Sequence, residues 1–161
     1  MATGSRRRWR MAAGRSRTWV YGGLRVADGQ RVTCTAPSRN SVHDQRFLAL
    51  VEQVNPTGEV VVITDNLSSH TSVATRDWLA GHPRLQQVFI PKKACWLNLQ
   101  EGWWRLFRRQ ALAGQCFADA GEITLATRVA TAQLNARARP WVWGRPPLPT
   151  RHRRRTFVYR I

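Results

Sequence analysis

Two acidic residues, Asp65 and Glu101, have the chemistry and the positions that suit metal-dependent work on phosphate esters. Asp65 follows the apolar run at residues 60–63 after one residue, Thr64, so we expect its carboxylate at the tip of a buried strand, where active groups of open α/β sheets lie. Thirty-five residues separate it from Glu101, which we place one turn inside a helix that points back toward that edge. Two divalent ions in a phosphoryl-transfer site need hard oxygen ligands. The alternative is that Asp65 only forms a turn or caps a helix.

Four polar residues near these acids are further candidates. Asn66 and His70 follow Asp65 and either orient a metal-bound water, touch a DNA backbone or, for Asn66, simply cap the turn. Lys92 and Lys93 lie between the two acids in the loop that follows the strand expected at 85–90. We expect them beside a scissile phosphate, and the alternative is that they are solvated loop lysines.

The helix that carries Glu101 combines cations with aromatic residues. Arg105, Arg108 and Arg109 extend a basic surface past the acid, and such a stripe contacts phosphates more often than bases. Trp103 and Trp104 follow Glu101 at helical spacing, and we expect them to pack in the core or at an interface instead of stacking on bases.

Hydrophobic periodicity predicts the elements that must position these residues. Apolar and β-branched runs joined by Asp28-Gly29 predict a hairpin, and spacings of three and four residues predict amphipathic helices. The order implies an α/β fold, a mixed sheet with flanking helices. We expect a basic arm at 1–16, the folded domain at 17–139 and a basic Pro/Arg-rich extended tail at 140–161. Strands are expected at 18–26, 30–36, 59–64 and 85–90, and helices at 41–54, 71–80, 96–113 and 119–138.

The charge is concentrated at the two ends of the chain. The formal net charge is +17, yet residues 28–122 carry ten basic and nine acidic groups, whereas 1–27 and 123–161 carry seven and nine arginines with no acid. Arginine clusters neutralise phosphates and release counterions, which favours nucleic-acid binding over a mere composition bias. Three scattered cysteines and the lack of a signal peptide or a long apolar run argue against a disulfide framework, a zinc site and a membrane protein.

Two motifs together resemble a known family. The strand ending in TDN with a histidine four residues after the Asn, and the stretch PKKACWLNLQEGWW, resemble DDE transposases of bacterial insertion sequences, in the branch related to mariner. The resemblance implies a ribonuclease H-like fold, three acids that bind two magnesium or manganese ions, and cleavage and joining of transposon ends in DNA. It gives Asp65 the place of the second acid and Glu101 that of the third. It also implies a cytoplasmic, nucleoid-associated bacterial protein.

The family's first acid has no counterpart before Asp28, which lies in the predicted hairpin turn. We therefore expect a C-terminal, truncated and inactive part of a transposase that lacks the first strand of its sheet. Arg-rich residues 7–13 would fill that gap poorly. One alternative is a noncatalytic DNA-binding protein that competes with intact transposase or pairs with it, and a homodimer of this chain is also possible. The other alternative is an unfolded remnant.

Overall fold

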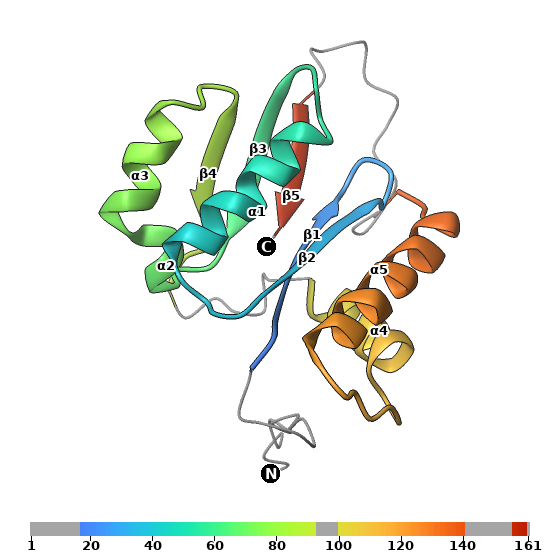
Figure 1. Cartoon of the computed structure of the whole chain (residues 1–161). Helices are drawn as coiled ribbons and strands as arrows, with labels where there is room; N and C mark the ends of the chain where they lie inside the picture. The colour runs from blue at the N-terminus through green and yellow to red at the C-terminus, as the bar shows by residue number, and fades with distance from the viewer. Residues whose placement is uncertain (1–16, 93–99, 141–155, 161) are drawn as a thin grey trace.

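The computed structural model describes residues 17–92, 100–140 and 156–160. A five-stranded sheet with the order β2-β1-β5-β3-β4 forms the centre, and helices lie on its two faces (Figure 1). The structure is therefore a mixed α/β fold, as predicted, and it is consistent with a partial ribonuclease H-like fold.

The predicted hairpin is confirmed. Strands β1 (Trp19–Arg25) and β2 (Arg31–Ala36) pair antiparallel with Leu24 opposite Arg31. Gly29 in the connecting turn has φ +74°, a conformation that glycine adopts without steric cost. Asp28 accepts hydrogen bonds from the side chain of Arg25 and from the Gln30 amide, which fixes the turn.

Strands β3 (Glu59–Thr64) and β4 (Leu85–Phe89) pair in parallel, and both were predicted within one residue. The faces of β3 differ in their burial. Val60, Val62 and Thr64 are fully buried under α1, whereas Val61 and Ile63 on the opposite face stay partly exposed. The prediction that helices cover both faces of this strand is therefore only half correct.

The expected extended tail is wrong for residues 156–160. Strand β5 (Thr156–Arg160) lies in the middle of the sheet, parallel to β3 along five residues and antiparallel to β1 at two, where it pairs with Leu24 and Arg25. It occupies a gap in the middle of the sheet of the kind that we expected from a missing first strand. A strand from the C-terminal end of the chain fills that place, because Tyr159 brings a fully buried aromatic ring to the core.

The described residues form five helices around the sheet. The helix predicted at 71–80 is α3, which begins two residues later because Ser72 adopts an extended backbone and caps it by accepting from Thr75 N; the short helix α2 before it was not predicted. Part of the helix predicted at 96–113 lies outside the described residues. No helix in the described ranges is long and apolar enough to cross a bilayer. The helices are α1 (Ser41–Gln53), α2 (Ser68–Thr71), α3 (Val73–Ala80), α4 (Gln100–Ala111) and α5 (Ala120–Ala136).

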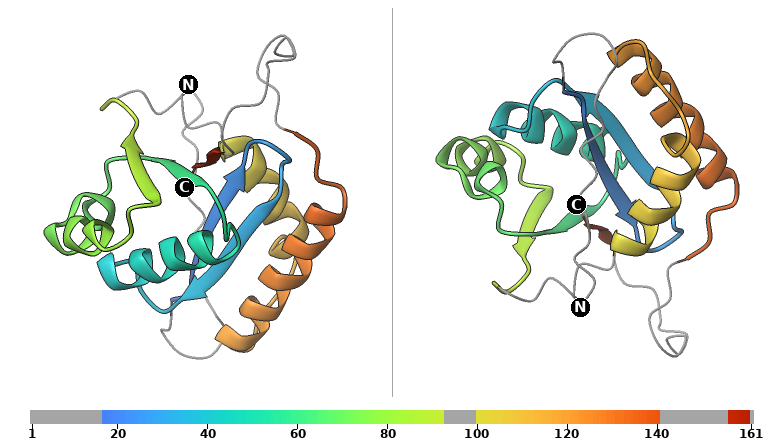
Figure 2. Two further views of the ribbon diagram at one scale, coloured as in Figure 1. Left: turned by 90° about the horizontal axis from the view of Figure 1, so that it is seen from above. Right: turned by 90° about the horizontal axis from the view of Figure 1, so that it is seen from below.

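Adjacent glycines in β1 show that α1 and α4 lie on opposite faces of the sheet. A Cβ on Gly22 would meet Trp103 of α4 at 2.7 Å, and one on Gly23 would meet Phe47 of α1 at 3.4 Å. Successive strand residues point to opposite faces. Figure 2 shows the same layering, with α4 and α5 together on the side of β1 and β2 away from α1.

Two hydrophobic clusters follow from this layering. The larger lies under α1 and joins Phe47 and Val51 to Val60, Val62 and Tyr159. The smaller lies under α4 and α5, where Trp103 and Phe107 are fully buried and pack at a ring-centroid distance of 5.3 Å. Core packing of Trp103 is thus confirmed, and its neighbour Trp104 is half-buried beside it.

Candidate active site

Asp65 lies at the end of a strand that is held on both of its edges. β3 pairs with β4 on one side and with β5 on the other, so the backbone that presents Asp65 is fixed by the sheet. One carboxylate oxygen accepts a hydrogen bond from the Leu67 amide at 3.2 Å, and the side chain is 45 % exposed. Asp65 therefore helps to form a turn, which is one of the two structural roles that we considered for it. Its carboxylate nevertheless remains open to solvent.

His70 lies between two carboxylates. Its Nδ1 is 2.9 Å from Oδ1 of Asp44, and its Nε2 is 3.7 Å from Oδ1 of Asp65. The nearer contact has an ion-pair distance without the alignment of a hydrogen bond. Asp44 is fully buried and His70 is 4 % exposed, so the carboxylate and the imidazole ring face each other away from solvent. This position argues against the direct DNA contact that we predicted for His70 and suits a residue that supports Asp65.

Asn66 ties the end of β3 to the end of β4. Its Nδ2 donates to the Ile90 carbonyl at 2.6 Å, and the Ile90 amide donates to the Thr64 carbonyl at 2.8 Å. This bond favours a structural role for Asn66 over contact with a metal-bound water or with DNA, because the protein itself engages the side-chain amide.

Glu101 stands in the first turn of α4, with its side chain 74 % exposed. The preceding residue fixes that turn to the sheet, since the buried Nε2 of Gln100 donates to the Gly22 carbonyl at 2.8 Å. Trp103 packs against the same glycine. Glu101 forms an ion pair with Arg108 at 4.0 Å, and an exposed pair of this kind stabilises little.

The sheet register places Asp65 level with Gly22, the residue to which Gln100 in the first turn of α4 is bonded. Leu24 of β1 and Ile63 of β3 both pair with Arg160 of β5. Because β1 and β3 run in opposite directions, Gly22 and Asp65 are level two residues further on. One strand position separates them, which corresponds to about 10 Å between backbones. No direct contact between the two carboxylates is found among the described residues.

A comparison with protein families identifies the family of this chain. A model of the DDE superfamily endonucleases matches residues 1–124, which is most of the chain and includes both acids. The chain belongs to the DDE superfamily endonucleases. A search of curated proteins gave no match. The matched range includes β1 to α4 and ends inside α5, so β5 of this DDE endonuclease lies outside it.

The metal-binding capacity of this DDE endonuclease depends on few groups. No three His, Cys, Asp or Glu side chains in the described part of the chain are close enough together to hold a metal ion. Asp65 and Glu101 are exposed oxygen donors of the type that magnesium and manganese prefer. Gln100 adds a buried carboxamide oxygen that has no hydrogen-bond partner among the described residues. Asp65 and Glu101 thus have the donor chemistry of a divalent-ion site, and the described residues bring no third His, Cys, Asp or Glu beside them.

The predicted basic residues of this endonuclease lie on its surface where the structure describes them. Arg105, Arg108 and Arg109 are exposed on the solvent side of α4, and Lys92 is exposed after β4. Lys93 lies outside the described residues. The three arginines share a helix with Glu101, so cations line the approach to that acid.

Sequence reasoning missed two buried polar residues of the site. Asp44 lies on the apolar face of α1, three residues before Phe47 and seven before Val51, and an acid inside such a stripe is a signal of a buried partner. Gln100 precedes Glu101 in a helix whose apolar spacing predicts that position to be buried, four residues from Trp104 and seven from Phe107. Both signals were available in the sequence.

Proposed function

We propose that this chain derives from a transposase of a bacterial insertion sequence related to mariner elements, an enzyme whose substrate is DNA. Family membership supports the endonuclease chemistry, and the observation that carries the proposal is the common level of Asp65 and α4 across the sheet. Transposon ends are the substrate that this proposal implies. Pairing with a second copy or with an intact transposase belongs to the same proposal.

Asp65 and Glu101 have the ligand role in this proposal. Two magnesium or manganese ions bound there would polarise the scissile phosphate and lower the pKa of a bound water. The protein contributes rigid placement: β3 holds Asp65, the Asp44–His70 pair supports it, and the bond from Gln100 to β1 holds the first turn of α4. Arg105, Arg108 and Arg109 would contact the DNA backbone and fix its position without reading its sequence.

Two carboxylates bind divalent ions less tightly than three, because each added anion strengthens the site's attraction for a cation. We therefore propose that the isolated chain cleaves DNA weakly or not at all. The experiment is a magnesium titration by calorimetry combined with cleavage of supercoiled plasmid DNA in manganese. Weak binding that disappears in Asp65→Asn and Glu101→Gln supports the ligand roles, and tight binding at two sites that both substitutions leave intact would refute them.

A noncatalytic DNA-binding role is the second candidate. It is supported by the exposed arginines of α4 and the excess of arginine at both ends of the chain. This role predicts DNA binding that weakens steeply with salt and survives Asp65→Asn and Glu101→Gln. Electrophoretic mobility shifts between about 50 and 200 mM salt measure this binding. The plasmid-cleavage assay separates the two functions, because only an endonuclease loses cleavage with either substitution.

A further inference from the structure

The free edge of β2 has a defined hydrogen-bonding pattern. The Arg25 amide donates to the Gln30 carbonyl at 2.8 Å, so residues that exchange hydrogen bonds with β1 alternate from that pair. The residues between them turn their backbone N–H and C=O groups away from β1. These outward residues are Arg31, Thr33 and Thr35.

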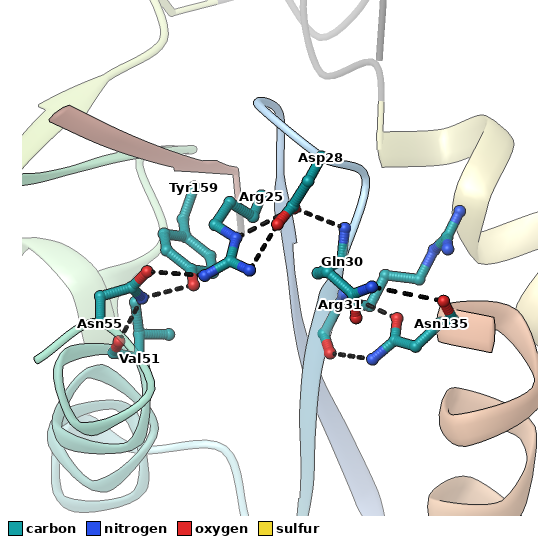
Figure 3. Close-up of polar contacts among 8 residues, drawn as sticks. All are labelled: Arg25, Asp28, Gln30, Arg31, Val51, Asn55, Asn135 and Tyr159. Carbon is teal, nitrogen blue, oxygen red and sulfur yellow. Dashed lines mark hydrogen bonds and ion pairs between the residues drawn. The ribbon is translucent and has the colours of Figure 1, made fainter. Parts of the chain in front are cut away.

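Asn135 of α5 occupies the place of a neighbouring strand at one of these positions. The Arg31 amide donates to Oδ1 of Asn135 at 2.8 Å, and Nδ2 of Asn135 donates to the Arg31 carbonyl at 2.9 Å (Figure 3). A side-chain amide thus makes both bonds that a sixth strand would make there. No described residue makes the equivalent bonds to Thr33 or Thr35, so two further strand positions are available.

A groove runs along this edge, which we call the β2 groove. Its volume is about 560 Å³, and residues 31–35 of β2 line it throughout. Leu50 and Val54 of α1 form one wall, and Thr127 and Thr131 of α5 line the other. Because α1 and α5 lie on opposite faces, a strand laid along β2 would be covered on both sides (Figure 2). Five paired residues would extend over about 13 Å.

The charged groups of the β2 groove are cations. Arg31 is half-buried, burial lowers its pKa, and its Nε has no partner among the described residues. Its Nη1 donates to the Leu134 carbonyl at 3.0 Å near the C-terminal end of α5. This hydrogen bond explains the position of Nη1 and does not involve Nε. Arg128 adds a second cation, and none of the lining residues is acidic. Thr127 is 2 % exposed and its hydroxyl also lacks a described partner.

We propose that the β2 groove binds an extended, acidic peptide segment of a partner protein, which adds to the sheet as a strand beside β2. Thr33 and Thr35 would pair with the peptide backbone, apolar side chains would pack on the α1 wall, and a carboxylate would reach Arg31. The arginine-rich ends of this chain and a second copy of it carry the wrong sign of charge. A DNA strand lacks the alternating N–H and C=O groups that the edge of β2 pairs with.

The probe is a fluorescein-labelled hexapeptide in which glutamate and valine alternate, measured by fluorescence anisotropy with the full chain. Its control has the same side chains and charge but is N-methylated at every peptide nitrogen, so it cannot add to a strand. We expect the unmethylated peptide to bind at least about tenfold more tightly, a difference of 1.4 kcal/mol. Equal binding of the two peptides would reduce the effect to nonspecific attraction by a basic protein and overturn the proposal.

Protein variants locate the binding. Thr33→Pro removes an outward N–H that β1 does not use, and edge strands tolerate proline at such positions. Arg128→Glu reverses a charge in the groove, and Arg109→Glu makes the same change on α4. We expect the first two to weaken the probe at least about tenfold and the third to have a smaller effect.

Two outcomes would overturn the assignment. If Arg109→Glu weakens the probe as much as Arg128→Glu does, the peptide does not bind in the groove. If sedimentation shows a dimer that Thr33→Pro dissociates, the occupant is a second copy and not an acidic partner. Should Thr33→Pro fail to fold by circular dichroism, the methylated peptide and the two charge reversals still decide.

Discussion

Replacing Tyr159 tests whether the end of the chain is the central strand of the sheet. The ring of Tyr159 is fully buried in the larger hydrophobic cluster, and its hydroxyl is hydrogen-bonded to Nδ2 of Asn55, which is itself buried (Figure 3). Truncation of a large buried aromatic side chain to alanine costs about 3–5 kcal/mol. Domains are stable by about 5–15 kcal/mol, so Tyr159→Ala removes a large share of the total.

Tyr159→Phe separates the ring from the hydroxyl. It keeps the packed ring and removes one partner of Asn55, whose Nδ2 still donates to the Val51 carbonyl at 2.7 Å. We expect a loss of about 1 kcal/mol for this change. Leu125→Ala is the control, because Leu125 is 51 % exposed on α5 and its truncation should cost about 0.5 kcal/mol or less.

Urea unfolding and thermal melting by circular dichroism measure these differences. At about 2–4 °C per kcal/mol for a chain of this size, Tyr159→Ala should lower the melting temperature by roughly 6 °C or more. An extended tail would give no such effect. A Tyr159→Ala variant that melts with the wild type would refute the central position of β5 and restore the tail that we first expected.

Three further perturbations follow from single contacts. Gly22→Ala should destabilise the fold by about 1–3 kcal/mol in urea titrations, because the new Cβ would lie 2.7 Å from the buried ring of Trp103. Burial raises the pKa of both tyrosines, Tyr21 and Tyr159, so stability should hold below pH 10 and fall as pH rises through the folded-state values; tyrosinate absorbance should therefore appear together with unfolding. Burial would raise the pKa of Asp28, but hydrogen bonds from a guanidinium and a backbone amide outweigh it and lower the pKa; Asp28→Asn should therefore remove up to about 1 kcal/mol of stability that the wild type loses as pH falls below 4.

Local signals in the sequence were sufficient for most elements. Asp28-Gly29 between two β-rich runs predicted the hairpin, and the observed positive φ of Gly29 explains why that pair is reliable. The continuous apolar run at 60–63 predicted β3 with correct bounds, because β-branched residues favour a strand even where one of its faces stays partly exposed. These elements depend on residues that are near one another in the sequence.

β5 could not be predicted in this way. Its five residues follow a run of proline and arginine, and they show no turn signal or long apolar pattern of their own. The strand forms because β1 and β3 leave a place between them, and its partners lie 97 residues earlier in β3 and 134 to 136 residues earlier in β1. The support of Asp65 by Asp44 and His70 has the same origin, since three separate elements bring those residues together.

The place of β5 also determines how the two candidate ligands are held relative to each other. Asp65 belongs to a half made of β3, β4, α2 and α3, whereas Glu101 belongs to a half made of β1, β2, α4 and α5, and α1 packs against strands of both halves. β5 joins the halves with five paired residues on the β3 side and two on the β1 side. Loss of packing at Tyr159 should therefore loosen the β1 side first, where fewer pairs hold the strand, and let Glu101 move relative to Asp65. A divalent ion bound by both acids would weaken in Tyr159→Ala before the helices unfold.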